Sequence, residues 1–238
     1  MRLSSKRKVR SVFADKSNLV SRVTYADQIY AELCRSLTSG ELAPGDRLSI
    51  RKIAENLGVS MMPVREAITR LAVDGALEIL PTKAVRVPVM TSAVFHELTT
   101  VRIRIEGFAA EQAAVRRSDV QLAAIKRYDA EFREAISRNQ PNNEEALLAN
   151  RNLHFAVYQA SGFPTLVRIT EMLWLRVGPI INLDLKSSVA WRAKAALDHH
   201  AQLVQAIETG NGSQAAKALE ADLLGTARFV IEAGYFHD

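Results

Sequence analysis

Two short apolar patterns with helical spacing, separated by one tight turn, constrain the fold of this chain more than any other feature. Apolar residues recur at i, i+3, i+4 and i+7 over residues 50–57, and the same spacing returns over residues 64–71. Gly58-Val59-Ser60 lies between them, where glycine suits a tight turn and Ser60 is a natural N-cap for the second helix. Two short helices joined in this way form a helix-turn-helix.

The segments on either side of this motif complete a small domain. Before it, apolar residues recur every four positions from Tyr25 and predict a helix that ends near Gly40. After it, residues 77–89 contain two short apolar strands joined by a turn. Residues 25–90 therefore predict a winged helix-turn-helix with a small two-stranded wing.

Helical spacing dominates the remainder of the chain, residues 91–238. The breaks between the helices are short and rich in Gly, Pro, Ser and Asn, which favour turns. The predicted helices cover residues 92–116, 119–138, 144–161, 164–185, 189–209 and 213–235. Joined by short loops, they predict an antiparallel bundle of six to seven helices. The expected fold class is therefore mainly α, with the winged helix-turn-helix in the N-terminal part.

The distribution of charge indicates a polyanionic partner. Residues 1–90 contain 15 Lys and Arg against 9 Asp and Glu, a net charge of +6, whereas the remainder carries −1. Such asymmetry predicts a nucleic-acid-binding module joined to a near-neutral one. Residues 1–24 show no helical or strand spacing, and we expect them to form a basic flexible arm. The alternative is that this arm is simply solvated and has no partner.

Several classes of protein are excluded by the sequence. No apolar run approaches the ~20 residues of a membrane span, and the basic N-terminus is not followed by the apolar core of a signal peptide. A single cysteine, Cys34, cannot form an intramolecular disulfide. The sequence contains neither a phosphate-binding glycine loop, nor a paired serine and histidine motif, nor HExxH. We therefore expect a cytoplasmic protein that is not an enzyme.

Two parts of the chain resemble the modules of a known family. Gly40–Pro81, with its PGDRL, LGVS and PVREAITRL segments, strongly resembles the winged helix-turn-helix of GntR-family bacterial transcription regulators. VRIRIEGFAAEQAA (Val101–Ala114), NRNLHFAVYQASG (Asn150–Gly162) and HAQLVQAIETGN (His200–Asn211) resemble the all-helical FCD ligand-sensing domain of the FadR-type subfamily. The resemblance implies a homodimer that reads a palindromic operator in double-stranded DNA. It also implies a regulator that is most often a repressor.

One face of the second motif helix is the predicted DNA-reading surface. Met61, Arg65 and Thr69 share the face opposite the apolar one and would enter the major groove. Arg65 is expected to contact a base, since a guanidinium can bind guanine O6 and N7 together; the alternative is an ion pair with a nearby carboxylate. The resemblance also makes Arg51 and Arg65 DNA-contacting residues. The residues expected to contact phosphates are Lys52, Arg70, Lys83 and Arg86.

The chain departs from the family pattern at two of these DNA-facing positions. Met61 stands where the family usually has arginine, so one base or phosphate contact is lost. Ala84 lies where the wing usually has glycine. We therefore expect DNA binding to be retained with an operator different from the commonest one of the family.

Arg102 is the expected contact for an effector carboxylate. It lies four residues before Glu106 on the first predicted bundle helix, and the resemblance places an arginine and a glutamate at these positions. A guanidinium binds a carboxylate through two parallel hydrogen bonds. The alternative is that Arg102 pairs with Glu106 within the helix.

The FCD resemblance also implies a metal site. Its four positions fall on Asn150, His154, His200 and Asp222, where the family usually has Asp at the first and His at the last. Both substitutes carry oxygen donors, so the set can hold Zn²⁺, Ni²⁺ or Mn²⁺ with open positions for an effector carboxylate. His199, adjacent to His200, is expected to point about 100° away. The alternative is that both histidines are hydrogen-bonded core residues around a metal-free pocket.

Two functions follow from these expectations. The first is a transcription repressor released by a small organic acid bound in the bundle, with the divalent metal ion as part of the site. The alternative is a constitutive DNA-binding protein whose bundle serves only dimerisation.

Overall fold

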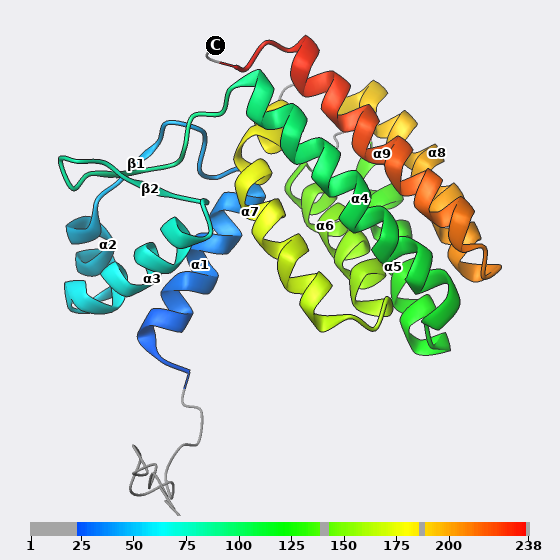
Figure 1. The fold of residues 1–238 in the computed structure, drawn as a ribbon, viewed down its shortest axis with the longest axis horizontal. Coiled ribbons are helices and arrows are strands. Elements are labelled where there is room, and N and C mark those ends of the chain that lie inside the picture. Colours follow the sequence, from blue (N-terminus) through cyan, green and yellow to red (C-terminus); the bar gives the residue numbers. More distant parts are fainter. Residues whose placement is uncertain (1–22, 139–142, 186–188, 237–238) are drawn as a thin grey trace, which may run out of the picture.

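A computed structural model describes residues 23–138, 143–185 and 189–236 of the chain. The predicted basic arm lies almost entirely outside the described residues. The described chain is mainly helical and has two parts, a small N-terminal part and a larger bundle of helices (Figure 1). This arrangement confirms the predicted fold class.

The N-terminal part is a helix-turn-helix with a small antiparallel sheet. Its elements are α1 (Tyr25–Ser39), β1 (Arg47–Leu48), α2 (Ile50–Leu57), α3 (Met61–Val73), β2 (Glu78–Ile79) and β3 (Val85–Arg86). The strand order is β1-β3-β2, so the sheet has one strand more than the predicted two-stranded wing. The chain leaves the turn at residues 43–46 alongside β3, and Arg47 pairs with Arg86 there. This pairing satisfies backbone groups that would otherwise lie on an open strand edge.

Local signals explain where these helices begin and end. The Thr24 side chain accepts a hydrogen bond from the backbone of Asp27, whose carboxylate in turn accepts from the backbone of Thr24. Gly58 has a φ of 64°, which lets the chain turn sharply between α2 and α3. The core joins the buried faces of α1 and α3 to the sheet. It is formed by Ile29, Leu33, Leu37, Val64, Ala67, Ile68, Leu71, Val85 and Val87.

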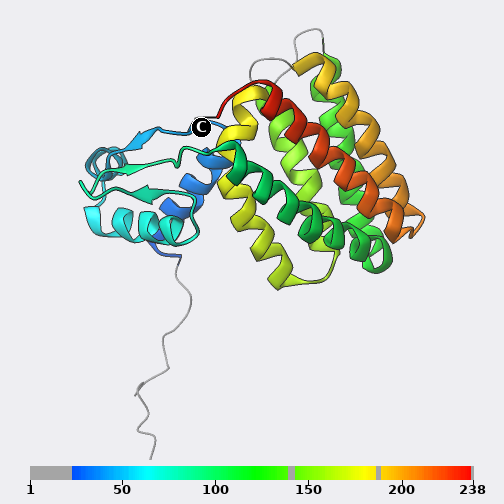
Figure 2. The same ribbon diagram turned by 45° about the horizontal axis from the view of Figure 1, so that its top comes forward.

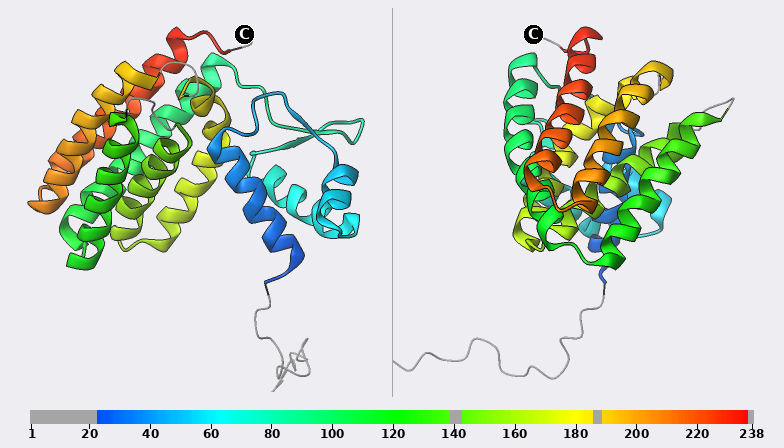
Figure 3. Two further views of the ribbon diagram at one scale, coloured as in Figure 1. Left: turned by 180° about the vertical axis from the view of Figure 1, so that it is seen from behind. Right: turned by 90° about the vertical axis from the view of Figure 1, so that its right-hand side faces the viewer.

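The bundle consists of six helices in the described part of the chain. They are α4 (Ser92–Arg116), α5 (Asp119–Ser137), α6 (Asn143–Ala160), α7 (Pro164–Leu185), α8 (Val189–Glu208) and α9 (Gly212–Glu232). Each predicted helix is present with its ends shifted by no more than three residues. Helix α4 packs along α9, α9 along α8, and α5 along α6 (Figure 3). None of the helices in the described ranges has both the length and the apolar character needed to cross a membrane.

Helices α1 and α7 form a tight seam between the two parts (Figure 2). Leu175 of α7 is buried within the N-terminal core. The Asn182 side chain donates a hydrogen bond of 2.7 Å to the backbone carbonyl of Thr38, at the end of α1. At Gly178 the two helices are so close that an added Cβ would lie 2.8 Å from the carbonyl oxygen of Leu37. The N-terminal part is therefore held against the bundle by backbone contact.

Gly178→Ala should lower the free energy of unfolding by about 1–3 kcal/mol, because the new methyl group meets backbone atoms that cannot rotate away. Gly107→Ala is the matched control, since its Cβ would meet nothing closer than 3.9 Å. That substitution should leave stability unchanged or raise it by up to about 1 kcal/mol. Urea denaturation compares the two variants. Equal stability would contradict a tight seam at Gly178.

Candidate functional site

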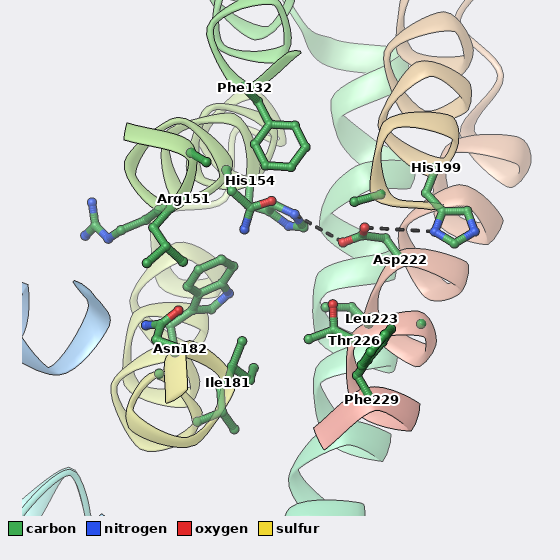
Figure 4. A pocket seen from close by; sticks show the side chains of 18 of the residues that line it. Phe132, Arg151, His154, Ile181, Asn182, His199, Asp222, Leu223, Thr226 and Phe229 are labelled. Carbon is green, nitrogen blue, oxygen red and sulfur yellow. Dashed lines mark ion pairs between the residues drawn. The ribbon is translucent and has the colours of Figure 1, made fainter. Parts of the chain in front are cut away.

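A cavity of about 420 Å³ lies within the bundle, lined by all six of its helices (Figure 4). Its wall includes His154 and Asp222 towards one end and Asn182 towards the other (Figure 4). Thr38 of α1 also lines it. The cavity therefore reaches from a cluster of polar side chains in the bundle to the seam with the N-terminal part.

Three buried side chains gather at the polar end of this cavity. His154 from α6, His200 from α8 and Asp222 from α9 place ligand atoms within 4.8 Å of one another. The Nε2 atom of His154 lies 3.3 Å from one oxygen of Asp222, and Nε2 of His200 lies 3.6 Å from the other. Asn150 lines the same cavity one helical turn before His154. The structure thus brings three of the four predicted ligands together and places the fourth, Asn150, in the wall of the same cavity.

Three of the four ring nitrogens in this cluster are buried without a hydrogen-bond partner. Among the described residues, nothing bonds Nε2 of His154 or either ring nitrogen of His200. Burying such atoms unpaired is costly, and it is explained when a lone pair is reserved for a ligand. Two imidazole nitrogens beside a carboxylate are a donor set suited to a divalent cation. The residues present therefore fit a metal ion.

The electrostatics of the cluster favour the protonation states that a metal ion requires. Burial, opposed only in part by the charge of Asp222, lowers the pKa of His200 to about 4. Burial raises the pKa of Asp222, but the facing His200 and His154 outweigh it and bring the value to about 2. At neutral pH the cluster therefore holds a neutral His200 and a charged carboxylate, and neither has to lose a proton to bind a cation.

A hydrogen-bond network behind His154 fixes the orientation of its ring. The Tyr158 hydroxyl lies 3.0 Å from Nδ1 of His154 and donates a short hydrogen bond to the carboxylate of Glu106. Since the phenol has one proton, its oxygen accepts from Nδ1–H, and the lone pair of His154 is left on Nε2, facing Asp222. Burial, together with the charge of Glu106, raises the pKa of Tyr158 and keeps this proton in place. The network was not expected from the sequence, although the four-residue spacing of His154 and Tyr158 could have indicated it.

Arg102 lies in the cavity wall but is already engaged. Its guanidinium contacts both oxygens of Glu106, with Nε at 2.6 Å and Nη2 at 3.3 Å, and both side chains are buried. The Trp174 indole donates to the same carboxylate at 3.3 Å. These contacts match the alternative stated for Arg102, an ion pair with Glu106 within α4.

His199 lies closer to the cluster than expected. Its ring lines the cavity, and Nδ1 is 4.0 Å from an oxygen of Asp222 (Figure 4). The neighbouring position on α9 is Gly225, where an added Cβ would lie 3.5 Å from the His199 ring. The missing side chain at Gly225 leaves room for this ring to approach Asp222 from the far side.

The predicted DNA-reading residues lie together on the outer face of α3. Met61, Arg65 and Thr69 are exposed, and the Thr69 hydroxyl bonds back to the carbonyl of Arg65 at 2.8 Å. Within the described part of the chain, the Arg65 guanidinium has no ion-pair partner, so its donors are available. Lys83 lies in the loop between β2 and β3 with a φ of 64°, a left-handed conformation usually taken by glycine.

Three of the other predicted DNA contacts are paired with carboxylates. Arg51 pairs with Glu55 at 2.8 Å on the surface of α2. Arg70 pairs with Asp27 at 2.8 Å and also covers the Tyr30 ring. Arg86 pairs with Glu78 across the sheet. Lys52 is exposed on α2. The pairs of Arg51 and Arg70 are exposed and that of Arg86 is half-buried. Exposed ion pairs are weak, so a phosphate can replace the carboxylate at Arg51 and Arg70.

Comparison with known protein families gives two matches that together cover most of the chain. The model described as "Bacterial regulatory proteins, gntR family" matches residues 25–87, and the FCD domain model matches residues 97–224. The second match alone spans more than half of the chain.

Individual relatives agree with these matches. The HTH-type transcriptional regulator McbR of Escherichia coli (strain K12) is 31% identical over 160 residues, 67% of this chain and 72% of that one. The probable D-xylose utilization operon transcriptional repressor of Paenarthrobacter nicotinovorans is 27% identical, over 85% of this chain and 87% of that one. The solved structure of E. coli McbR/YncC superposes with a TM-score of 0.82 at 25% identity, covering 89% of this chain and 99% of that one.

The stability of the metal-free protein should fall as the pH is lowered from about 6.5 towards 4. Over this range the unfolded chain takes up a proton at His200 that the folded chain, with a pKa of about 4, does not bind. The full shift corresponds to a loss on the order of 3 kcal/mol. Urea denaturation in the presence of a chelator, at several pH values in this window, measures the slope.

His200→Gln should remove this part of the pH dependence, and His199→Gln, at a half-buried position, is the control that should keep it. Asp222 does not interfere, because its lowered pKa affects stability only below its ordinary value of 3.8. An unchanged slope in His200→Gln would show that another group is responsible.

Proposed function

Because this chain belongs to the GntR family of bacterial regulatory proteins and carries an FCD domain, we propose that it is a repressor released from DNA by a small carboxylate effector. The family establishes the coarser statement, that the chain is a DNA-binding transcription regulator. The matched families are regulators and not enzymes, which confirms that expectation from the sequence. Repression and its release by an effector are the finer part of the proposal.

The observation that carries this proposal is the position of the cavity. One end holds the cluster of His154, His200 and Asp222, and the wall also includes Thr38, which belongs to the DNA-binding part. A ligand in the cavity can therefore contact the end of α1 directly, or disturb the bond from Asn182 to Thr38. A ligand that prefers one arrangement of this seam shifts the position of the DNA-reading helix. One relative, from Paenarthrobacter nicotinovorans, is described as a probable transcriptional repressor, which supports repression rather than activation by this chain.

The proposed metal ligands are Asn150, His154, His200 and Asp222, which would hold one Zn²⁺, Ni²⁺ or Mn²⁺ ion. The orphaned nitrogens of both histidines support this assignment. Such an ion supplies positive charge and open coordination positions for a carboxylate. Arg102 contributes to the wall near this end, where its charge is balanced by Glu106.

The proposed DNA contacts divide into base and phosphate contacts. Arg65 reads a base from the exposed face of α3, with Met61 and Thr69 beside it, and Arg51 joins the contact from α2. The phosphate contacts are Lys52, Arg70, Lys83 and Arg86. One motif of this size covers a few base pairs, so a homodimer on a palindromic operator, in the cytoplasm, completes the proposal.

Arg65→Ala should weaken binding to the operator by roughly 1–3 kcal/mol and leave binding to scrambled DNA nearly unchanged, because a base contact is lost. Lys83→Ala should weaken both alike, because a phosphate contact carries no sequence information. Gel-shift titrations on a sequence selected from random DNA, and on a scrambled version, measure both effects. Equal losses on the two sequences for Arg65→Ala would refute its role in reading a base.

The purified protein should carry about one divalent ion per chain. His154→Ala and His200→Ala should each lose it, because each removes a donor from the cluster. His199→Ala is the control and should retain it, since its Nδ1 is 4.0 Å from Asp222 and outside the three-residue group. Elemental analysis after mild purification, followed by titration with Mn²⁺, Ni²⁺ and Zn²⁺, measures the content. A wild-type protein that contains no divalent ion and binds none on titration would contradict the proposed metal site.

The same preparations separate the repressor from the alternative, a constitutive DNA-binding protein whose bundle only dimerises. Thermal melting of the metal-loaded chain with a panel of small carboxylic acids should show a shift of several degrees for one compound. The shift should disappear in His154→Ala. If no acid shifts the melting temperature of the wild type, the alternative is favoured.

A further inference from the structure

We propose that the outer face of α4 is the surface on which a second copy of this chain docks. The proposal rests on the homodimer of the proposed function and deepens it by naming the contact. The surface is a stripe of four apolar side chains, Val94, Val101, Phe108 and Val115, called here the α4 stripe.

The α4 stripe has the spacing of a helix-packing surface. Its members recur every seven residues and are 37%, 40%, 45% and 71% exposed, in chain order. Seven residues are close to two helical turns, so all four lie on one side, over a length of about 31 Å. The other side of α4 is buried in the bundle through Phe95, Leu98, Ala109, Ala110 and Ala113. A helix that is apolar on both sides is expected to be covered on both.

Exposed apolar side chains also occur on the segments next to α4. Phe108 stacks on Phe163, just before α7, with ring centres 5.8 Å apart. Ile169 and Met172 on α7 and Leu224 on α9 are also exposed. Helix α4 lies between α7 and α9 at the front of the bundle (Figure 1). A row of exposed apolar side chains along one helix marks a protein interface more often than an ordinary solvated face.

The charges beside the stripe identify a second copy as the occupant. Glu97, Arg104 and Glu111 are exposed, repeat with the same seven-residue spacing and alternate in sign. Within the described part of the chain, none of the three makes an ion pair. An antiparallel contact about a two-fold axis beside Val101 places Arg104 next to Glu97 of the other copy, and the reverse pair forms by symmetry. A two-fold axis beside Phe108 instead places Arg104 next to Glu111 of the other copy. In either register the row is complementary to itself, as a two-fold interface requires.

This contact would link the cavity to the spacing of the two DNA-reading helices. Helix α4 begins at Ser92, only six residues after β3 ends at Arg86, so a dimer formed along α4 constrains where the two motifs lie. Its inward side carries Arg102 and Glu106, which belong to the network behind His154. One helix therefore contacts the second copy on one side and the cavity on the other.

Sedimentation equilibrium of the full chain tests the surface. The wild type should be a dimer, and Val101→Glu and Phe108→Glu should each weaken dimerisation at least tenfold, because a charge enters an apolar contact. Val120→Glu on α5 is the matched control, an 81% exposed valine away from the stripe, and should remain dimeric. Thermal melting of each variant checks that the fold is intact.

Arg104→Glu gives a second test at an exposed position, where folding is not at risk. It should weaken the dimer by bringing like charges together. Adding Glu97→Arg or Glu111→Arg should restore it, and the one that does so identifies the register. Residues seven apart lie about 10.5 Å apart along one helix, too far for a direct pair within the chain, so a rescue must act between copies.

These experiments distinguish a failure of the α4 stripe from a failure of the proposed homodimer. A monomeric wild type would overturn both. A dimeric wild type with Val101→Glu, Phe108→Glu and Arg104→Glu all still dimeric would leave the homodimer standing and overturn the α4 stripe.

Discussion

The buried ion pair between Arg102 and Glu106 organises the centre of the bundle. Glu106 is completely buried, and an isolated carboxylate there would be prohibitively costly, so the guanidinium of Arg102 must accompany it. With its charge balanced, Glu106 can also accept hydrogen bonds from Tyr158 and Trp174. Tyr158 in turn directs the lone pair of His154 towards Asp222. The ion pair between Arg102 and Glu106 therefore determines, through Tyr158, that the lone pair of His154 lies on Nε2 and faces Asp222.

The second constraint is the close approach of α1 to α7. Because Gly178 lacks a side chain, the end of α1 reaches the cavity wall, and Thr38 becomes part of it. The bond from Asn182 caps a carbonyl at the end of α1, a group that has no partner within its own helix. The DNA-binding part is thus attached at the cavity by contacts that a ligand can alter.

Helical spacing predicted the helices well because their ends carry local signals, such as the caps formed by Thr91 and Ser118. Strand β1 was not predicted, since two residues have no periodicity and depend on pairing with β3. The family pattern indicated the cluster of His154, His200 and Asp222, but the approach of His199 depends on the space beside Gly225. The bond from Asn182 to Thr38 joins residues 144 positions apart, and no spacing within a helix can indicate such a contact.

For the proposed anionic effector, the charges at the polar end of the cavity would set an order of events. Arg102 is neutralised by Glu106, and the lowered pKa values keep His200 neutral and Asp222 charged at neutral pH. The cluster of His154, His200 and Asp222 therefore carries about one negative charge by itself and repels a carboxylate brought close to it. The proposed divalent cation on the cluster would reverse the sign to about one positive charge, so a carboxylate would be attracted only afterwards. Asp222, on α9, supplies the negative charge of the cluster, whereas the amide of Asn150, on α6, adds none. Recognition of the effector would then depend on the metal ion more than on Arg102.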